Sequence, residues 1–202
     1  MSNNCTKESF LEDVKDHEIT IIKDKEVYRH IRMMTTGPNK WNQKYDIITW
    51  PDHLCYTGDM GTYVFQRTED MFSFFRNEKM EISSGYWAEK CLSESIFGEG
   101  IRQWSVELFR EAVLEYIMNV LDLETKEEIP EEYLEEAYSL LHAEDEWECI
   151  SAYRDFNSEL FDLTDLFDGF SGKEKTYHFI WCLYAIVFAI KKYDEKRGEL
   201  ES

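Results

Sequence analysis

The feature that most constrains this chain is an almost unbroken apolar run at residues 177–190, YHFIWCLYAIVFAI. The run is 14 residues long, whereas a helix needs about 20 apolar residues to cross a bilayer. We therefore predict that residues 173–196 form a buried central helix and not a membrane span. Apolar residues make up 43% of the chain and aromatic residues 15%, enough to build a sizeable core around such a helix.

Earlier in the chain, apolar and polar residues alternate with a period of two, which is typical of β-strands. Strands are predicted at residues 19–24, 26–34, 44–50, 53–58 and 61–66. Pro51 ends the third of these strands, because proline cannot donate to a strand ladder. Gly58 and Gly61 bracket a two-residue connection between the last two strands, which predicts a tight hairpin.

From residue 68 onward the apolar spacing becomes helical. Helices are predicted after an N-cap at Thr68, over 84–92, from Ser105 to about Leu121, after Pro130, and over 144–160. Tyr138 and Trp147 fall among the apolar positions of the last two helices, so both are expected to face the core.

The order of strands first and helices second predicts an α+β fold. We expect a small N-terminal antiparallel β-meander of about five strands, packed against a C-terminal layer of about five helices. With 202 residues, the chain suits a single domain over residues 1–202. Its β-rich half would cover about 17–67 and its helical half about 68–196.

The net charge of −20 is concentrated in one part of the chain. Residues 122–168 hold 17 acidic residues and only two basic ones, a balance of −15, against −6 for residues 1–121 and +1 for residues 169–202. Such a field repels nucleic acid and anionic membrane surfaces and attracts basic partners. Direct nucleic-acid binding is thus disfavoured, because affinity for phosphates comes mainly from Lys and Arg.

The acidic residues of this segment form the first candidate site. Those expected to point outward from the helices are Glu127, Glu128, Glu131, Glu132, Glu135, Glu136, Glu144, Asp145 and Glu148. One interpretation is a solvated acidic face. The other is a docking surface for a basic protein or nucleoprotein complex, on which rows of carboxylates stand in for phosphates.

A second candidate site lies in the predicted sheet. Tyr28, His30 and Arg32 alternate onto one face of the second strand, with Asp46 or Arg67 nearby. Such a face is able to hold a small anion or a nucleotide. The plainer alternative is an exposed sheet face with ordinary cross-strand pairs.

The sequence has no recognisable catalytic or metal-binding motif, so we predict no catalytic residue, metal or cofactor and favour a binding protein over an enzyme. Phosphate-binding glycine loops and the GxSxG nucleophile motif do not occur. His142 and Glu146 are four residues apart, but a closed metal site needs about four ligands. Five cysteines with no CxxC motif, and no apolar signal segment, indicate reduced thiols in a cytoplasmic protein.

Three segments resemble a family of uncharacterised proteins of bacteriophages and prophages. They are ITWPDHLCYTGDMGTYVFQRTEDMFSFF at 48–75, GYWAEK at 85–90 and YHFIWCLYAIVFAIKKYD at 177–194. The likeness covers about Ile19 to Asp194. It implies an accessory phage protein made in the cytoplasm of the host bacterium, and it brings no activity or catalytic residue with it.

These observations give three functional hypotheses. The first is a phage-encoded inhibitor of a host defence effector, such as a CRISPR complex or a nuclease, that places its acidic helices on a nucleic-acid-binding surface. The second is a small-anion or nucleotide-binding protein, a sponge or an enzyme, that uses the sheet face. The third is a phage factor in replication or host takeover with neither role.

Overall fold

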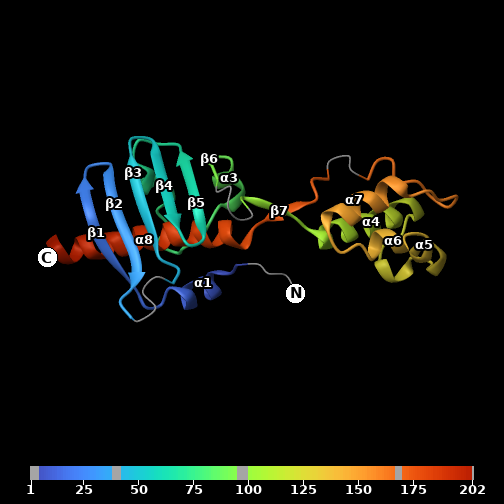
Figure 1. Cartoon of the computed structure of the whole chain (residues 1–202), viewed down its shortest axis with the longest axis horizontal. Coiled ribbons are helices and arrows are strands. Elements are labelled where there is room, and N and C mark those ends of the chain that lie inside the picture. The colour runs from blue at the N-terminus through green and yellow to red at the C-terminus, as the bar shows by residue number, and fades with distance from the viewer. Residues whose placement is uncertain (1–4, 38–41, 95–99, 167–169, 202) are drawn as a thin grey trace. The chain divides into compact units, whose positions relative to one another are not determined.

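The computed structural model describes residues 5–37, 42–94, 100–166 and 170–201. The chain folds into two compact units: unit 1 comprises Met1–Arg102 and Lys175–Ser202, and unit 2 comprises Gln103–Glu174. Unit 2 is therefore an insertion into the sequence of unit 1. The fold class is α+β, as predicted, with an antiparallel sheet near the N-terminus followed by helices (Figure 1).

Unit 1 is built on a six-stranded antiparallel sheet whose strands lie side by side in chain order. The strands are β1 His17–Lys25, β2 Tyr28–Thr35, β3 Tyr45–Trp50, β4 His53–Gly58, β5 Gly61–Gln66 and β6 Cys91–Ser93. The prediction of about five strands was one strand short. Residues 84–92 were predicted as one helix, but α3 covers only Ser84–Ala88 and the chain then pairs with β5 as β6.

Two tight turns place the central strands in register. Pro51 and Asp52 connect β3 to β4, and Asp52 has a φ of 65°. Asp59 and Met60 connect β4 to β5, where Gly58 pairs with Gly61. The predicted hairpin at this position is confirmed, and Gly61 has a φ of 115°, which a residue with a Cβ rarely adopts.

The apolar run identified in the sequence forms the core of α8, Tyr177–Glu201, which crosses one face of the sheet (Figure 1). Its start is fixed by Thr176, whose Oγ1 accepts the backbone N–H of Phe179 at 3.1 Å. The predicted helix over 173–196 was therefore placed slightly too early. No helix in the described residues is long and apolar enough to span a membrane.

Two short helices pack against α8. On α1, Lys7–Asp13, the ring of Phe10 meets that of Trp181 edge to face at 5.0 Å. On α2, Met71–Phe75, the ring of Phe72 meets that of Tyr193 at 5.1 Å. The predicted N-cap of α2 was wrong: Asp70, not Thr68, accepts the backbone N–H of Phe72. The distinctive segment 48–75 thus forms turns, strands and a capped helix.

Unit 2 is mostly helical. Its helices are α4 Val106–Leu121, the 3-10 helix η1 Lys126–Glu128, α5 Glu131–Glu136, α6 Tyr138–Leu141 and α7 Glu146–Asp155. Ser105 caps α4 as predicted, since its side chain accepts the N–H of Leu108. The core of unit 2 is separate from that of unit 1 and includes Phe109, Val113, Ile117, Leu140, Cys149 and Phe161.

The chain enters and leaves unit 2 through a two-stranded sheet of β7, Arg102–Trp104, and β8, Lys173–Lys175. The division drawn from the sequence between residues 67 and 68 does not coincide with the two units. Residues 68–102 and the whole of α8 belong with the sheet, and the inserted helices form their own unit.

Candidate functional site

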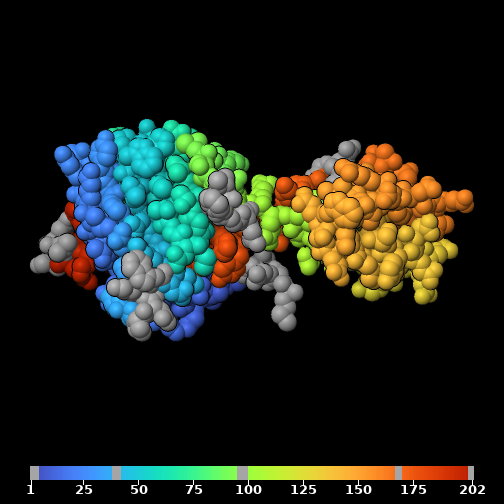
Figure 2. Space-filling view, in the orientation of Figure 1, coloured from blue at the N-terminus to red at the C-terminus, as the bar shows by residue number. Residues whose placement is uncertain are grey.

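Almost all the net charge lies in unit 2. The sequence of this unit holds 21 acidic and four basic residues, a balance of −17, which leaves −3 for unit 1. The partition is sharper than the segment 122–168 indicated, because three glutamates of α4 belong to the same unit. Figure 2 shows unit 2 as a rounded body, coloured from yellow-green to orange.

All nine acidic residues predicted as a docking surface are exposed, on η1, on α5 and around the start of α7. They are Glu127, Glu128, Glu131, Glu132, Glu135, Glu136, Glu144, Asp145 and Glu148. The structure therefore places their charges in contact with solvent. Exposure alone fits both interpretations, the solvated face and the docking surface.

Three of the nine side chains also stabilise local structure. Glu128 accepts hydrogen bonds from two backbone N–H groups ahead of η1, at 3.1 and 3.2 Å. At the start of α7, Asp145 accepts the N–H of Glu148 at 2.8 Å, and the Glu148 carboxylate accepts the N–H of Glu144 at 2.8 Å. Helix caps of this kind explain an acidic residue without any partner protein.

The other six side chains cap no helix. None of their side chains makes an ion pair or hydrogen bond with another described residue: Glu127, Glu131, Glu132, Glu135, Glu136 and Glu144. Glu131 and Glu135 are four residues apart on α5, as are Glu132 and Glu136. Like charges at this spacing destabilise a helix by about 0.2–0.5 kcal/mol per pair. These like charges therefore have a small stability cost, which the helix dipole offsets in part at Glu131 and Glu132 in the first turn of α5.

Two large aromatic residues of unit 2 were misplaced by sequence reasoning. Tyr138 and Trp147 were expected to face the core, but their exposed fractions are 61% and 75%. Each lies two positions from a fully buried residue, Leu140 and Cys149 respectively. Two helical positions correspond to a rotation of roughly 200°, so both aromatic side chains point away from the core.

The residues of the second candidate site lie together on the sheet, but their charges are balanced. Tyr28, His30 and Arg32 share one face of β2, and Asp46 lies next to them on β3. Arg32 donates to both Asp46 oxygens at 2.8 Å, and His30 Nε2 lies 2.9 Å from Oδ2. Burial raises the pKa of Asp46, but the hydrogen bonds from Arg32 and His30 outweigh it and lower the pKa below its ordinary value. Arg67 follows β5, with β3 and β4 between it and β2. This arrangement favours the ordinary cross-strand pair over an anion site.

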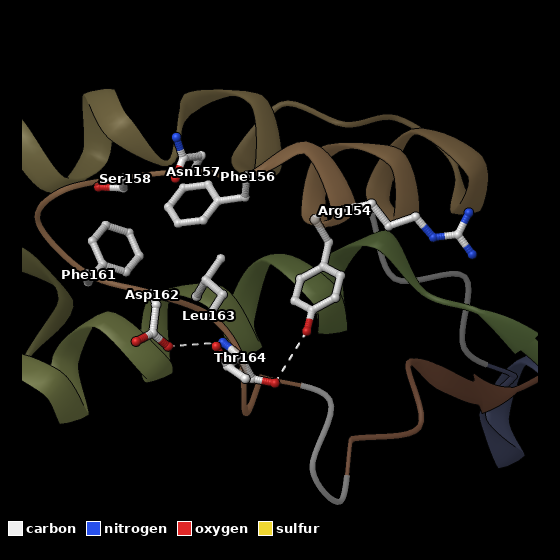
Figure 3. A pocket seen from close by; sticks show the side chains of 9 residues that line it. Arg154, Phe156, Asn157, Ser158, Phe161, Asp162, Leu163 and Thr164 are labelled. Carbon is white, nitrogen blue, oxygen red and sulfur yellow. Dashed lines mark hydrogen bonds between the residues drawn. The ribbon is translucent and has the colours of Figure 1, made fainter.

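A cavity of about 310 Å³ in unit 2 is formed by the end of α7 and the segment that follows it (Figure 3). Phe156, Phe161 and Leu163 supply its apolar walls, whereas the Arg154 side chain points away from them. Two of the polar groups here bond to other lining residues: Thr164 N–H donates to Asp162 at 3.1 Å, and the Tyr153 hydroxyl donates to the Thr164 carbonyl at 3.4 Å. A ligand site normally has a few polar groups converging on the space, so we read this cavity as loop packing.

None of the five cysteines is an activated nucleophile. All five are free thiols within the described residues, and burial raises the pKa of each. For Cys5 and Cys91 the pKa rises to about 11. A catalytic thiol has a lowered pKa instead. Among the described residues, no cluster of three or more His, Cys, Asp or Glu side chains is arranged to hold a metal ion.

The geometry thus offers charge and exposed aromatic surface, both in unit 2, and no assembled catalytic centre in the described residues. Comparisons of the chain with known protein families, with curated proteins and with solved structures find no match.

Proposed function

We propose that this chain is a binding protein whose unit 2 docks on a basic, nucleic-acid-binding surface of another protein. The observation that supports this proposal is the concentration of −17 of the −20 net charge in one compact unit. Six exposed glutamates there have no partner within the described residues, so their charges are available to a basic partner.

The physical argument rests on steering and competition. A surface of one sign raises the association rate with a surface of the opposite sign, and salt weakens that effect. Carboxylates fixed on α5 and η1 would occupy the Lys and Arg side chains that otherwise bind phosphates. The partner would then lose its access to nucleic acid.

The sequence resemblance suggests the biological setting of this proposal. In that setting the chain is a phage-encoded inhibitor, made in the host cytoplasm, of a defence effector such as a CRISPR complex or a nuclease. Its effect would come from occupying the nucleic-acid groove, without any chemical reaction. The small-anion alternative is the weaker proposal, because Asp46 already pairs with His30 and Arg32.

The test is affinity capture from bacterial lysate, with wild type and two charge variants side by side. The first variant reverses Glu131, Glu132, Glu135 and Glu136 to Lys. The matched control reverses Glu18, Glu69, Glu78 and Glu81, which are exposed residues of unit 1, so its net charge changes by the same amount.

We expect a nucleic-acid-binding protein that is retained by the wild type and the control, is lost with the α5 variant and elutes at moderate salt. Its purified form should lose nucleic-acid binding when the wild type is added. Equal retention by both charge variants would refute the acidic docking surface. A thermal shift of the wild type with a nucleotide panel, lost in Arg32→Ala, would support the small-anion alternative instead.

A further inference from the structure

A groove of about 470 Å³ lies between α6 and α7 on the surface of unit 2. Tyr138 and His142, four residues apart, line it from the α6 side. Trp147, Ser151 and Asp155, also spaced by four, line it from α7. The spacing of four places each set on one face of its helix, so the groove follows from the sequence of two neighbouring helices.

The groove holds the two most exposed large apolar side chains of the described residues, Trp147 and Tyr138. Single exposed apolar residues are common, but two large aromatic residues beside one groove form a patch. Trp and Tyr are also the residue types that dominate the binding energy of protein interfaces. Here they stand in the unit that has nearly all the net charge.

One wall of the groove is held in place before any partner arrives. The rings of Tyr138 and His142 stack at 3.9 Å with an interplanar angle of 18°. His142 Nδ1 lies 3.0 Å from the backbone carbonyl of Tyr138, a geometry in which the ring N–H donates. A rigid aromatic surface loses little conformational entropy when it binds.

The charges that line the groove are all negative. Glu148 and Asp155 contribute carboxylates, and no Lys or Arg is among its lining residues. Ser151 Oγ lies 3.5 Å from Asp155 Oδ2, a weak contact that leaves the other Asp155 oxygen open. Arg154 lines the separate cavity of Figure 3. The groove therefore combines aromatic faces with carboxylates, and both kinds of group attract a cation.

We propose that this groove binds an arginine side chain of a basic protein partner. A guanidinium is planar, stacks on aromatic faces and pairs with a carboxylate through two N–H groups, whereas a lysine ammonium is a compact, strongly hydrated charge. Stacking on Trp147 uses the first property, and pairing with the neighbouring Glu148 carboxylate, which also lines the groove, uses the second. This inference rests on the proposed function, since it names how unit 2 recognises its basic partner.

The experiment uses calorimetry to measure how tightly the whole chain binds two peptides. One peptide consists of six arginines and the other of six lysines. The wild type is expected to bind the arginine peptide about fivefold more tightly or better, in line with one cation–π contact. Trp147→Ala should lower the arginine affinity to the lysine level, and Trp147→Phe should keep part of the preference. Val120→Ala, which removes another exposed apolar side chain of unit 2, should leave both affinities unchanged.

The outcomes separate this inference from the function on which it rests. If Trp147→Ala binds the arginine peptide like the wild type, the groove is not the arginine site. If the charge reversals on α5 nonetheless lower the affinity for both peptides equally, the acidic docking surface is still supported. If neither peptide binds the wild type at low salt, both proposals fail. Circular dichroism confirms that each variant is folded, as expected for exposed positions.

Discussion

Asp70 pairs with Arg29 and caps α2 with the same carboxylate. Its Oδ1 accepts Arg29 Nη1 at 2.7 Å and the Phe72 N–H at 2.9 Å, and its Oδ2 accepts Arg29 Nη2 at 3.2 Å. The Arg29 guanidinium also lies over the Phe72 ring, 4.7 Å from its centre. One acidic residue therefore joins β2 to the helix that follows the meander.

Asp70→Ala should lower the free energy of unfolding by about 2–3 kcal/mol, because it removes a helix cap and one partner of a largely buried guanidinium. The Arg29 side chain is only 12% exposed, so water cannot fully replace the lost contacts. The matched control is Asp194→Ala, which breaks the exposed ion pair with Arg76 and should cost less than about 1 kcal/mol. Urea unfolding measures both. Equal costs would mean that the Arg29–Asp70 pair has no special structural weight.

The acid sensitivity of unit 1 follows from two carboxylates. Burial raises the pKa of Asp70, but the hydrogen bonds from Arg29 and the Phe72 N–H outweigh it and lower that pKa. The pKa of Asp46 is lowered in the same way by Arg32 and His30. A carboxylate with a lowered pKa in the folded state stabilises the protein above its unfolded pKa of about 3.9, and this contribution is lost as the pH falls through the folded pKa.

Asp70→Asn should therefore destabilise the protein most above about pH 4, and its difference from the wild type should shrink as the pH falls below that value. The same holds for Asp46→Asn. Urea midpoints measured from neutral to acidic pH test both substitutions. A difference that stays constant over this pH range would show that the carboxylate charge does not provide the stabilisation.

The elements that local sequence patterns predicted correctly are those decided within one segment. Apolar and polar residues alternate along the strands of the meander, and the apolar run of α8 is too apolar to be anything but a buried helix. Gly58 and Gly61 mark the hairpin between β4 and β5. The misses depend on contacts between distant segments. β6 has three residues and forms because it pairs with β5. β7 pairs with β8, although all the helices of unit 2 lie between them in the sequence. No local period shows such pairings.

The candidate site divides in the same way. The exposure of the acidic residues was predictable, because carboxylates avoid a core. The exposure of Tyr138 and Trp147 was not. Both stand on short helices where apolar residues occupy several faces, so the spacing alone did not identify the buried face. The tertiary contacts of Leu140 and Cys149 decide it.

Gly172 is required where β8 begins. Its φ is +61°, and an added Cβ would lie 2.6 Å from Trp104 Cη2. Gly172→Ala should destabilise unit 2 by about 2–3 kcal/mol, through backbone strain and displacement of the Trp104 ring. Gly198→Ala is the matched control, because Gly198 lies in α8 with open space around it. This substitution should raise the free energy of unfolding by up to about 1 kcal/mol. Thermal unfolding reports the two opposite signs, and a neutral Gly172→Ala would contradict the steric argument.

The like charges of α5 give a prediction that salt can test. Glu136 is the last residue of α5, four positions after Glu132. Glu136→Lys turns a repulsive pair into an attractive one and places a cation at the negative end of the helix dipole. It should therefore raise the free energy of unfolding by about 0.5–1 kcal/mol at low salt. Glu131→Lys makes the same charge change at the first residue of α5, where the dipole opposes it. The increase in the free energy of unfolding should be larger for Glu136→Lys than for Glu131→Lys, and it should decrease in high salt. Equal increases in the two variants would exclude a role for the helix dipole.

Unit 1 should fold without unit 2, because it has its own core and its two chain segments meet where the insertion begins. Thr176 N–H donates to the Ile101 carbonyl at 3.1 Å, and its Oγ1 donates to the Gly100 carbonyl at 2.7 Å. Replacing residues 104–173 with a short Asn-Gly turn would preserve this closure. The shortened chain should unfold in one cooperative transition, keep its sheet signal in circular dichroism, and lose the binding of basic peptides shown by the full chain. A shortened chain that is folded and still binds those peptides would move the docking surface to unit 1, whereas one that does not fold would show that unit 1 depends on the insertion.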